Sequence, residues 1–186
     1  MEGPGDTPEA ALVEKAIEGD KAAFGRLVEP HLPRLLGLAR RMLRSPEEAE
    51  DALQNALAST WMARAKLDPQ KPVAAYLTTV TLNKCRDRLR RHRVARLLSL
   101  ATIGTDIPVA ADEPDPDTEI ADRQLLAHVT REIDRLPLRL REALVLVAIE
   151  GRSHTEVAGL LGVTNKAVET RVYRARQRLR EKIDFL

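Results

Sequence analysis

The chain has 186 residues, which is enough for one domain or two small ones. Hydrophobic residues make up 44% of it and aromatic residues only 3%, so we expect an all-α fold with an aliphatic core. A single cysteine, Cys85, excludes an internal disulfide and a multi-cysteine zinc site. The Gly- and Pro-rich start and the lack of a long apolar run predict a protein without a signal peptide or membrane insertion. Together with the single cysteine this favours the cytoplasm, and we expect no cofactor.

Charge divides the sequence into three segments. Residues 1–93 carry 16 Lys and Arg against 13 Asp and Glu, and residues 122–186 carry 13 against 9. Residues 94–121 carry one Arg against six acids. Two basic modules therefore flank an acidic connector, and basic modules favour nucleic acid as a partner. We place the domain and linker boundaries accordingly: a helical domain at residues 8–98, a linker at 99–119 and a helical domain at 120–186.

Helix signals follow one another closely in the first module. Helices are predicted at residues 8–20 and 22–28, and a third apolar stretch covers residues 32–43. Ser45 then caps the best-marked helix, which has proline in its first turn and Glu48 at the position of a capping box.

The helix that starts at Ser45 has two different faces. Its inner stripe is small and aliphatic and ends at Trp61, which we expect in the core. Its outer face carries polar and anionic residues: Glu50, Asp51, Gln54 and Asn55. Such a face suits contact with a protein partner, although an ordinary solvated helix surface has the same pattern.

After a break at residues 68–72, a long helix runs from Pro72 to Leu98 and becomes strongly basic. Its basic residues are Lys84, Arg86, Arg88, Arg90, Arg91, Arg93 and Arg96. A helix with so many cations favours nucleic acid as a partner.

Residues 99–119 contain glycine, several prolines and a run of acids, without periodic apolar residues. We expect an extended or mobile linker. Fully extended, residues 94–121 reach at most about 90 Å, which exceeds about 70 Å for two turns of B-DNA. The two modules can then contact separate sites on one duplex.

The second module is predicted to end in a helix-turn-helix. It begins with helices at residues 122–136 and 138–149, each followed by a helix breaker. Ser153 and Glu156 then form a capping box, and Gly162 suits the left-handed residue that ends a short apolar helix.

Thr164 caps the last helix, which has an apolar and a cationic side. Its apolar stripe consists of Val168, Val172, Ala175, Leu179 and Ile183. A helix buried on one side and cationic on another is shaped for the major groove. The candidate base or phosphate contacts are Lys166, Glu169, Thr170, Arg171, Arg174 and Arg178. A surface helix with solvated arginines is the alternative, and Glu169 also suits a pair with a nearby Arg.

Taken in order, these motifs resemble those of bacterial sigma-70 family sigma factors of the extracytoplasmic-function type. In the first module the resemblance rests on Gly19–Phe24, Glu48–Gln54 and Leu82–Asp87. In the second it rests on several short segments: Leu136-Pro137, Arg141–Ala143, Glu150-Gly151, Glu156–Ala158 and Tyr173–Arg176. The similarity extends from about Leu12 to Ile183.

The resemblance implies an initiation factor without catalysis of its own, which binds core RNA polymerase and directs it to promoter DNA. It implies that the first domain reads and opens the −10 element and that the second reads the −35 element. The face that contains Asp51 would dock on the clamp helices of the polymerase largest subunit. The basic helix would lie against the opened strand, because single-stranded DNA is captured by cations that follow the backbone and by groups that stack on bases or bond to their edges. The contacts that the resemblance implies are Tyr76, Asn83, Lys84, Arg86 and Arg90, with Asn83 near a flipped base and a core position as the alternative for Tyr76. The resemblance also implies an anti-sigma protein that covers both modules, and a linker that enters polymerase channels.

Two stretches depart from the family pattern. Thr78, Thr79 and Thr81 stand where larger or basic residues are more usual, and the segment Asn165–Arg171 replaces a commoner version that contains Gly-Thr-Val. The promoter sequence therefore does not carry over from the family.

Three other classes of function are weaker. A dimeric helix-turn-helix regulator fits the second module but not the first, and gel filtration with core polymerase distinguishes the two. An enzyme is disfavoured because the chain has no Gly-rich phosphate loop, His154 and Glu156 are too close for a metal site, and Cys85 has no nearby His. The arginine-rich last helix argues against a protein that only sequesters a partner.

Overall fold

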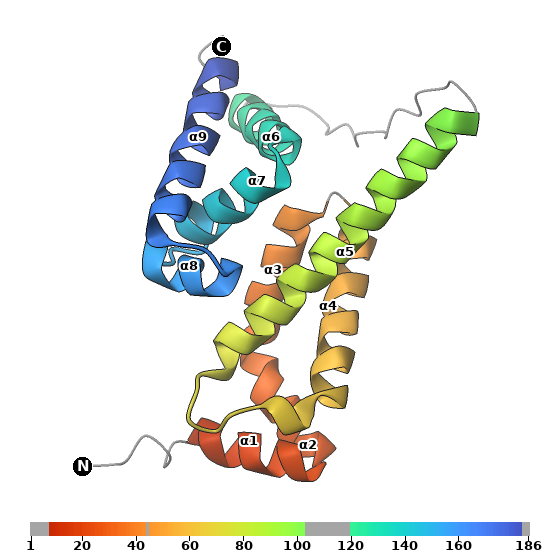
Figure 1. Cartoon of the computed structure of the whole chain (residues 1–186), viewed down its shortest axis with the longest axis vertical. Helices are drawn as coiled ribbons and strands as arrows, with labels where there is room; N and C mark the ends of the chain where they lie inside the picture. Colours follow the sequence, from red (N-terminus) through yellow and green to blue (C-terminus); the bar gives the residue numbers. More distant parts are fainter. Residues whose placement is uncertain (1–7, 44, 103–119, 184–186) are drawn as a thin grey trace. The chain divides into compact units, whose positions relative to one another are not determined.

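The computed structural model describes residues 8–43, 45–102 and 120–183. Throughout these residues the regular structure is helical, which confirms the all-α fold (Figure 1). The earlier helices are α1 (Pro8–Glu18), α2 (Lys21–Val28), α3 (Leu32–Met42), α4 (Pro46–Met62) and α5 (Val73–Thr102). The later ones are α6 (Ile120–Arg135), α7 (Leu138–Leu144), α8 (His154–Leu161) and α9 (Asn165–Ile183). By their contacts, α1 to α4 and the first part of α5 form one compact unit, and the main parts of α6 to α9 belong to a second.

Local side chains determine where the first helices begin. The carboxylate of Asp20 accepts the N–H of Ala22 at 2.8 Å and that of Ala23 at 3.0 Å, and so caps α2. These hydrogen bonds lower the pKa of Asp20, and the bond from Ala23 has the largest effect. The hydroxyl of Ser45 accepts the N–H of Glu48 at 3.2 Å, which confirms the predicted cap of α4.

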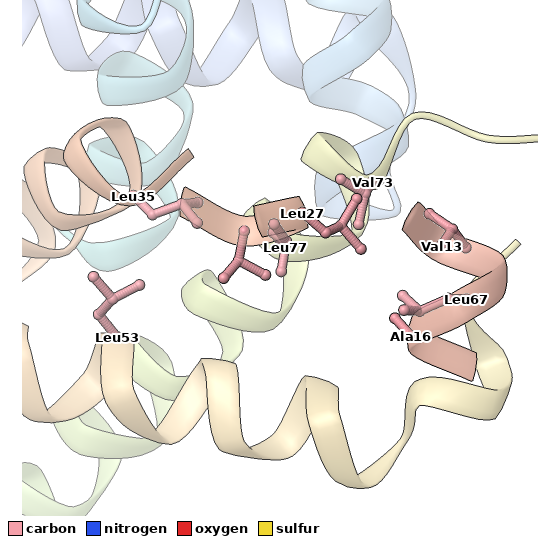
Figure 2. Packing of buried hydrophobic residues seen from close by; sticks show 9 residues of the cluster. Val13, Ala16, Leu27, Leu35, Leu53, Leu67, Val73 and Leu77 are labelled. Carbon is pink, nitrogen blue, oxygen red and sulfur yellow. The ribbon is translucent and has the colours of Figure 1, made fainter. Parts of the chain in front are cut away.

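The core of the first unit is aliphatic and draws on each of α1 to α5 (Figure 2). Its buried members are Val13, Ala16, Leu27, Val28, Leu35, Leu53, Leu67, Val73 and Leu77. Phe24 lies at the edge of this cluster, with its ring 5.3 Å from that of Trp61. The guanidinium of Arg64 stacks 4.7 Å from the centre of the Trp61 ring. Trp61 is partly buried by these contacts, in agreement with its predicted position on the inner stripe of α4.

α5 is held at its start by the first helix of the chain. The Glu9 carboxylate accepts the N–H of Val73 at 2.9 Å, a donor that the helix itself leaves without a partner. At its other end α5 continues past Leu98 to Thr102, so the first residues of the predicted linker are helical. The first helix breaker after Leu98 is Gly104, which explains the longer helix. The remaining residues of the predicted linker lie outside the described part of the chain.

The second unit differs from the sequence prediction in its second helix. The predicted helix at residues 138–149 ends as an α-helix at Leu144 and continues as a π-helical turn from Val145 to Ile149. The N–H of Glu150 reaches back to the carbonyl of Val145 at 2.9 Å. Val145 and Leu146 are both 0% exposed, so the wider turn keeps two successive side chains in the core.

Packing in the second unit joins its first helices to α9. One cluster contains Leu136, Leu144 and Ala175, with Ile133, Leu140 and Leu179 packed against it. A nearly buried ion pair links α7 to α6, with Arg141 Nη1 3.2 Å from Asp134 Oδ1. No helix in the described ranges is long and apolar enough to cross a bilayer.

Candidate nucleic-acid and protein interfaces

The predicted helix-turn-helix is present and is capped at both of its helices. The N–H of Ser153 donates to Glu156 Oε2 at 2.9 Å, and the N–H of Glu156 donates to the Ser153 hydroxyl at 3.2 Å. These contacts form the predicted capping box. Hydrogen bonds from the Ser153 hydroxyl and N–H lower the pKa of Glu156. Its stabilising contribution is therefore present above the ordinary carboxyl pKa and is lost as the pH falls through the lowered value.

The turn between α8 and α9 uses the predicted residues. Gly162 has a φ of +64°, in the left-handed region that favours glycine. The Thr164 hydroxyl accepts the N–H of Ala167 at 3.2 Å and so caps α9. The structure adds a contact that no local pattern indicates, in which Asn165 Nδ2 donates to the Thr155 hydroxyl at 3.1 Å. This bond ties the start of α9 to the first turn of α8.

α9 buries one side and exposes the other. Val168, Val172 and Ala175 are buried, whereas the side chains of Arg174 and Arg178 are exposed. The apolar and cationic sides thus lie where the sequence predicted them. The aromatic ring of Tyr173, which was not among the predicted contacts, is also 68% exposed.

The first residues of α9 form a small polar network. Lys166 Nζ lies 3.1 Å from Glu169 Oε2, so the partner of Glu169 is this lysine and not a nearby Arg. The Thr170 hydroxyl donates to the carbonyl of Lys166 at 2.8 Å. Arg171 is half-buried beside them. A Lys donor and a Glu acceptor therefore lie side by side at the helix surface.

The outer surface of α4 carries the residues predicted to meet a protein partner. All of them are exposed: Glu50, Asp51, Gln54 and Asn55. We call this surface the α4 polar face. Its carboxylates have partners on neighbouring helices, because Glu50 pairs with Arg40 at 3.1 Å and Asp51 with Arg88 at 3.4 Å. Asn55 Nδ2 donates to the main-chain carbonyl of Asp51 at 2.7 Å.

The residues of α5 predicted to contact DNA differ in how far they are exposed. Asn83 is exposed, and its Oδ1 accepts a hydrogen bond from Arg86 Nη1 at 2.9 Å. Lys84 is half-buried and Arg90 is exposed. Tyr76 instead packs, partly buried, against the core cluster, which is the alternative that the sequence left open.

The threonines that depart from the family pattern point mainly inward. Thr78 is 0% and Thr81 is 1% exposed. Thr78 accepts a hydrogen bond from Arg34 of α3 at 2.9 Å. Larger or basic side chains do not fit such buried positions without repacking, so these threonines belong to the helix packing.

No group of three or more His, Cys, Asp or Glu residues is placed to hold a metal ion in the ranges that the structure describes. Cys85, which lies in those ranges, is buried.

Comparisons with known proteins find matches to both parts of the chain. Residues 27–94 match Sigma-70 region 2, and residues 127–179 match Sigma-70, region 4. The chain is 37% identical over 177 residues to RNA polymerase sigma factor CnrH of Cupriavidus metallidurans, covering 93% of each chain. It is 34% identical over 178 residues to ECF RNA polymerase sigma factor SigM of Mycobacterium tuberculosis, covering 96% of this chain and 86% of SigM.

A solved structure gives the same result. CnrH in complex with the cytosolic domain of CnrY matches with a TM-score of 0.69 and 32% identity, over 95% of this chain and 97% of CnrH. The protein binds core RNA polymerase and directs it to specific promoters, and it has no catalysis of its own. Its region 2 reads the −10 element, and its region 4 reads the −35 element through the helix-turn-helix. The chain belongs to the sigma-70 family, as an RNA polymerase sigma factor of the extracytoplasmic-function type.

Proposed function

We propose that α9 reads the −35 element through its polar side, on which Thr170 and Arg171 are half-buried and the others exposed: Lys166, Glu169, Thr170, Arg171, Arg174 and Arg178. The observation that carries this proposal is the division of α9 into a buried side and an exposed cationic side. In the major groove a Lys donor suits guanine, and a Glu acceptor suits the amino group of cytosine. The adjacent pair of Lys166 and Glu169 is therefore the natural base reader, and the arginines farther along suit phosphates.

Replacement of Arg174 by alanine is expected to make promoter binding less dependent on salt. A phosphate contact contributes about −0.9 to the slope of log K against log salt, so the slope should fall by about one. The measurement is a salt titration of holoenzyme binding to a promoter that retains its −35 element. Arg180→Ala, an exposed substitution nearer the C-terminal end of α9, serves as the control and should leave the slope unchanged. An unchanged slope for Arg174→Ala would mean that Arg174 is only solvated.

We propose further that the α4 polar face docks on the clamp helices of the polymerase largest subunit. The face is exposed, polar and rigidly based on a capped helix, and it holds Gln54 and Asn55 beside two carboxylates. An interface of this kind gains specificity from charges that match those of its partner.

The double substitution Asp51→Arg with Gln54→Ala is expected to weaken binding to core polymerase by at least about tenfold. The reason is that a wrong charge at an interface, placed opposite a like charge of the partner, costs several kcal/mol. Circular dichroism should show an intact fold, because exposed substitutions usually change stability by less than about 0.5 kcal/mol. Binding is measured by anisotropy of the labelled sigma factor. An affinity equal to that of the wild type would remove the α4 polar face from the interface.

For the −10 element we propose contacts from α5, through Asn83, Lys84, Arg86 and Arg90, with Tyr76 as an added stacking group. Support comes from the exposed amide of Asn83 among cationic side chains, since captured strands need both kinds of group. Tyr76 fits this role less well than the others, because it packs against the core cluster.

The domains that we propose are residues 8–98 and 120–186, joined by residues 99–119. We infer that the protein works in the bacterial cytoplasm, where core polymerase and promoter DNA are found. CnrH, a similar protein, has been solved with the cytosolic domain of CnrY, which supports an anti-sigma partner for this chain as well. Native co-purification tests this, and recovery of polymerase alone under every growth condition would count against an anti-sigma partner.

A further inference from the structure

Arg88 belongs to the cationic run of α5, but its side chain is directed to α4. Its Nε lies 3.2 Å from Glu48 Oε1, and its Nη2 lies 3.4 Å from Asp51 Oδ2. The Arg88 side chain is only 28% exposed, whereas Asp51 is 57% exposed. The Arg88 side chain is thus mostly buried, and its guanidinium is engaged by two carboxylates of α4.

The geometry of this contact is that of a fork across two carboxylates. Glu48 and Asp51 are three residues apart on α4, so their side chains are neighbours on one helix face and repel each other. A planar guanidinium with several N–H donors bonds to both of them at once. The main-chain carbonyl of Asp51 also accepts the amide of Asn55 at 2.7 Å. Asp51 is therefore fixed through its side chain by Arg88 and lies on a capped, regular helix.

A second arginine acts on the neighbouring residue of the α4 polar face. Arg40 of α3 binds Glu50 at 3.1 Å, with both side chains 53% exposed. Both carboxylates of the face are thus held by arginines from flanking helices. The Arg88 contact is the less solvated of the two, and ion pairs near the surface gain strength as solvent is excluded.

We propose that Arg88 is a positioning residue for polymerase binding and not a DNA contact. It holds Asp51 in one orientation before docking, so less side-chain freedom is lost when the complex forms. It also joins α5, which carries Asn83, to the helix that bears the α4 polar face. This inference rests on the proposed role of that face.

The test compares Arg88→Ala with Arg90→Ala, a neighbouring exposed arginine that we assign to DNA. The dissociation constant of the full chain for core polymerase is measured first, and strand opening is then measured with holoenzyme assembled at saturating core polymerase. We expect Arg88→Ala to raise the dissociation constant about two- to fivefold, the range that partly exposed ion pairs give, with normal opening at saturation. Arg90→Ala should show normal polymerase affinity and reduced opening. Arg26→Ala, on the exposed side of α2, is the control for both measurements.

Two further variants separate positioning from general stability. Arg88→Lys keeps the charge but cannot fork across both carboxylates, so its dissociation constant should lie between those of the wild type and Arg88→Ala. In an Asp51→Asn background, Arg88→Ala should weaken binding by less than it does alone, because the two residues act through one contact. If Arg88 had a purely structural role, the effects of Arg88→Ala and Asp51→Asn on the dissociation constant would be additive. Arg88→Lys would then weaken binding as much as Arg88→Ala.

The possible failures are distinguishable. If Asp51→Asn weakens polymerase binding but Arg88→Ala does not, Arg88 positions nothing and the proposed role of the α4 polar face stands. If neither substitution changes the affinity, the face itself is wrongly assigned. If Arg88→Ala reduces strand opening at saturating polymerase, Arg88 is a DNA contact and the inference is overturned.

Discussion

Replacement of Leu35 by alanine is expected to lower the free energy of unfolding of the first domain by about 2–5 kcal/mol. Leu35 is 0% exposed and belongs to the core cluster of that domain, so truncation leaves a cavity among side chains from several helices (Figure 2). For a domain of about this size the unfolding midpoint falls by about 4–8 °C per kcal/mol, so a drop of at least about 8 °C should follow. Scanning calorimetry of the full chain measures it.

Met62→Ala is the matched control, because this side chain is 79% exposed and its loss should change stability by less than about 0.5 kcal/mol. The second domain forms its own compact unit, so its transition should keep its midpoint in Leu35→Ala. A common shift of both transitions would contradict two independently folding domains. An unaltered first midpoint would mean that Leu35 does not support the core.

Helix positions were predictable because their signals are local. Ser45, Ser153 and Thr164 each act on a backbone N–H within three residues, and Gly162 takes the left-handed conformation that its place after an apolar helix indicated. A contact between near neighbours in the sequence does not depend on how the helices pack. The helix-turn-helix could therefore be located residue by residue.

Contacts between helices were not predictable in this way. Arg88 was one cation among many in the sequence, and only the packing of α5 on α4 brings it to Glu48. The bond from Val73 to Glu9 likewise joins residues that are far apart in the chain. Which polar residues meet across two helices depends on the rotation of each helix about its axis. Hydrophobic periodicity shows only which side of a helix is apolar and which is polar, and not which polar residues become partners.

The role of Tyr76 shows the same limit. Scarcity of aromatic residues made it a candidate for stacking on a base, but its place on α5 turns it toward the core cluster. Tyr76→Leu distinguishes the two roles, since leucine keeps the apolar packing and removes the stacking. Reduced strand opening by a fully folded Tyr76→Leu variant would support stacking, and normal opening would assign Tyr76 to the core.

Replacement of Asn83 by alanine is expected to reduce promoter opening about ten- to a hundredfold, since a hydrogen-bonded base contact is worth about 1–3 kcal/mol. The Oδ1 of Asn83 already accepts a bond from Arg86 at 2.9 Å, so Nδ2 is the group of this amide that we expect to donate to a base. Permanganate footprinting of the holoenzyme on promoter DNA detects the opened strand. Binding to duplex DNA through the second domain should persist.

Asn83→Asp makes the test specific for that donor. Aspartate keeps the bond from Arg86, and strengthens it by its charge, but it presents only acceptors to the strand. Opening should therefore fall as far in Asn83→Asp as in Asn83→Ala, whereas Arg26→Ala should open the promoter normally. The loop before α5 is the competing location, where Lys71 pairs with Asp68 at 2.8 Å in an exposed turn. If Asn83→Asp opens the promoter normally and Lys71→Ala does not, the −10 contact lies in that loop and Asn83 is an ordinary surface residue.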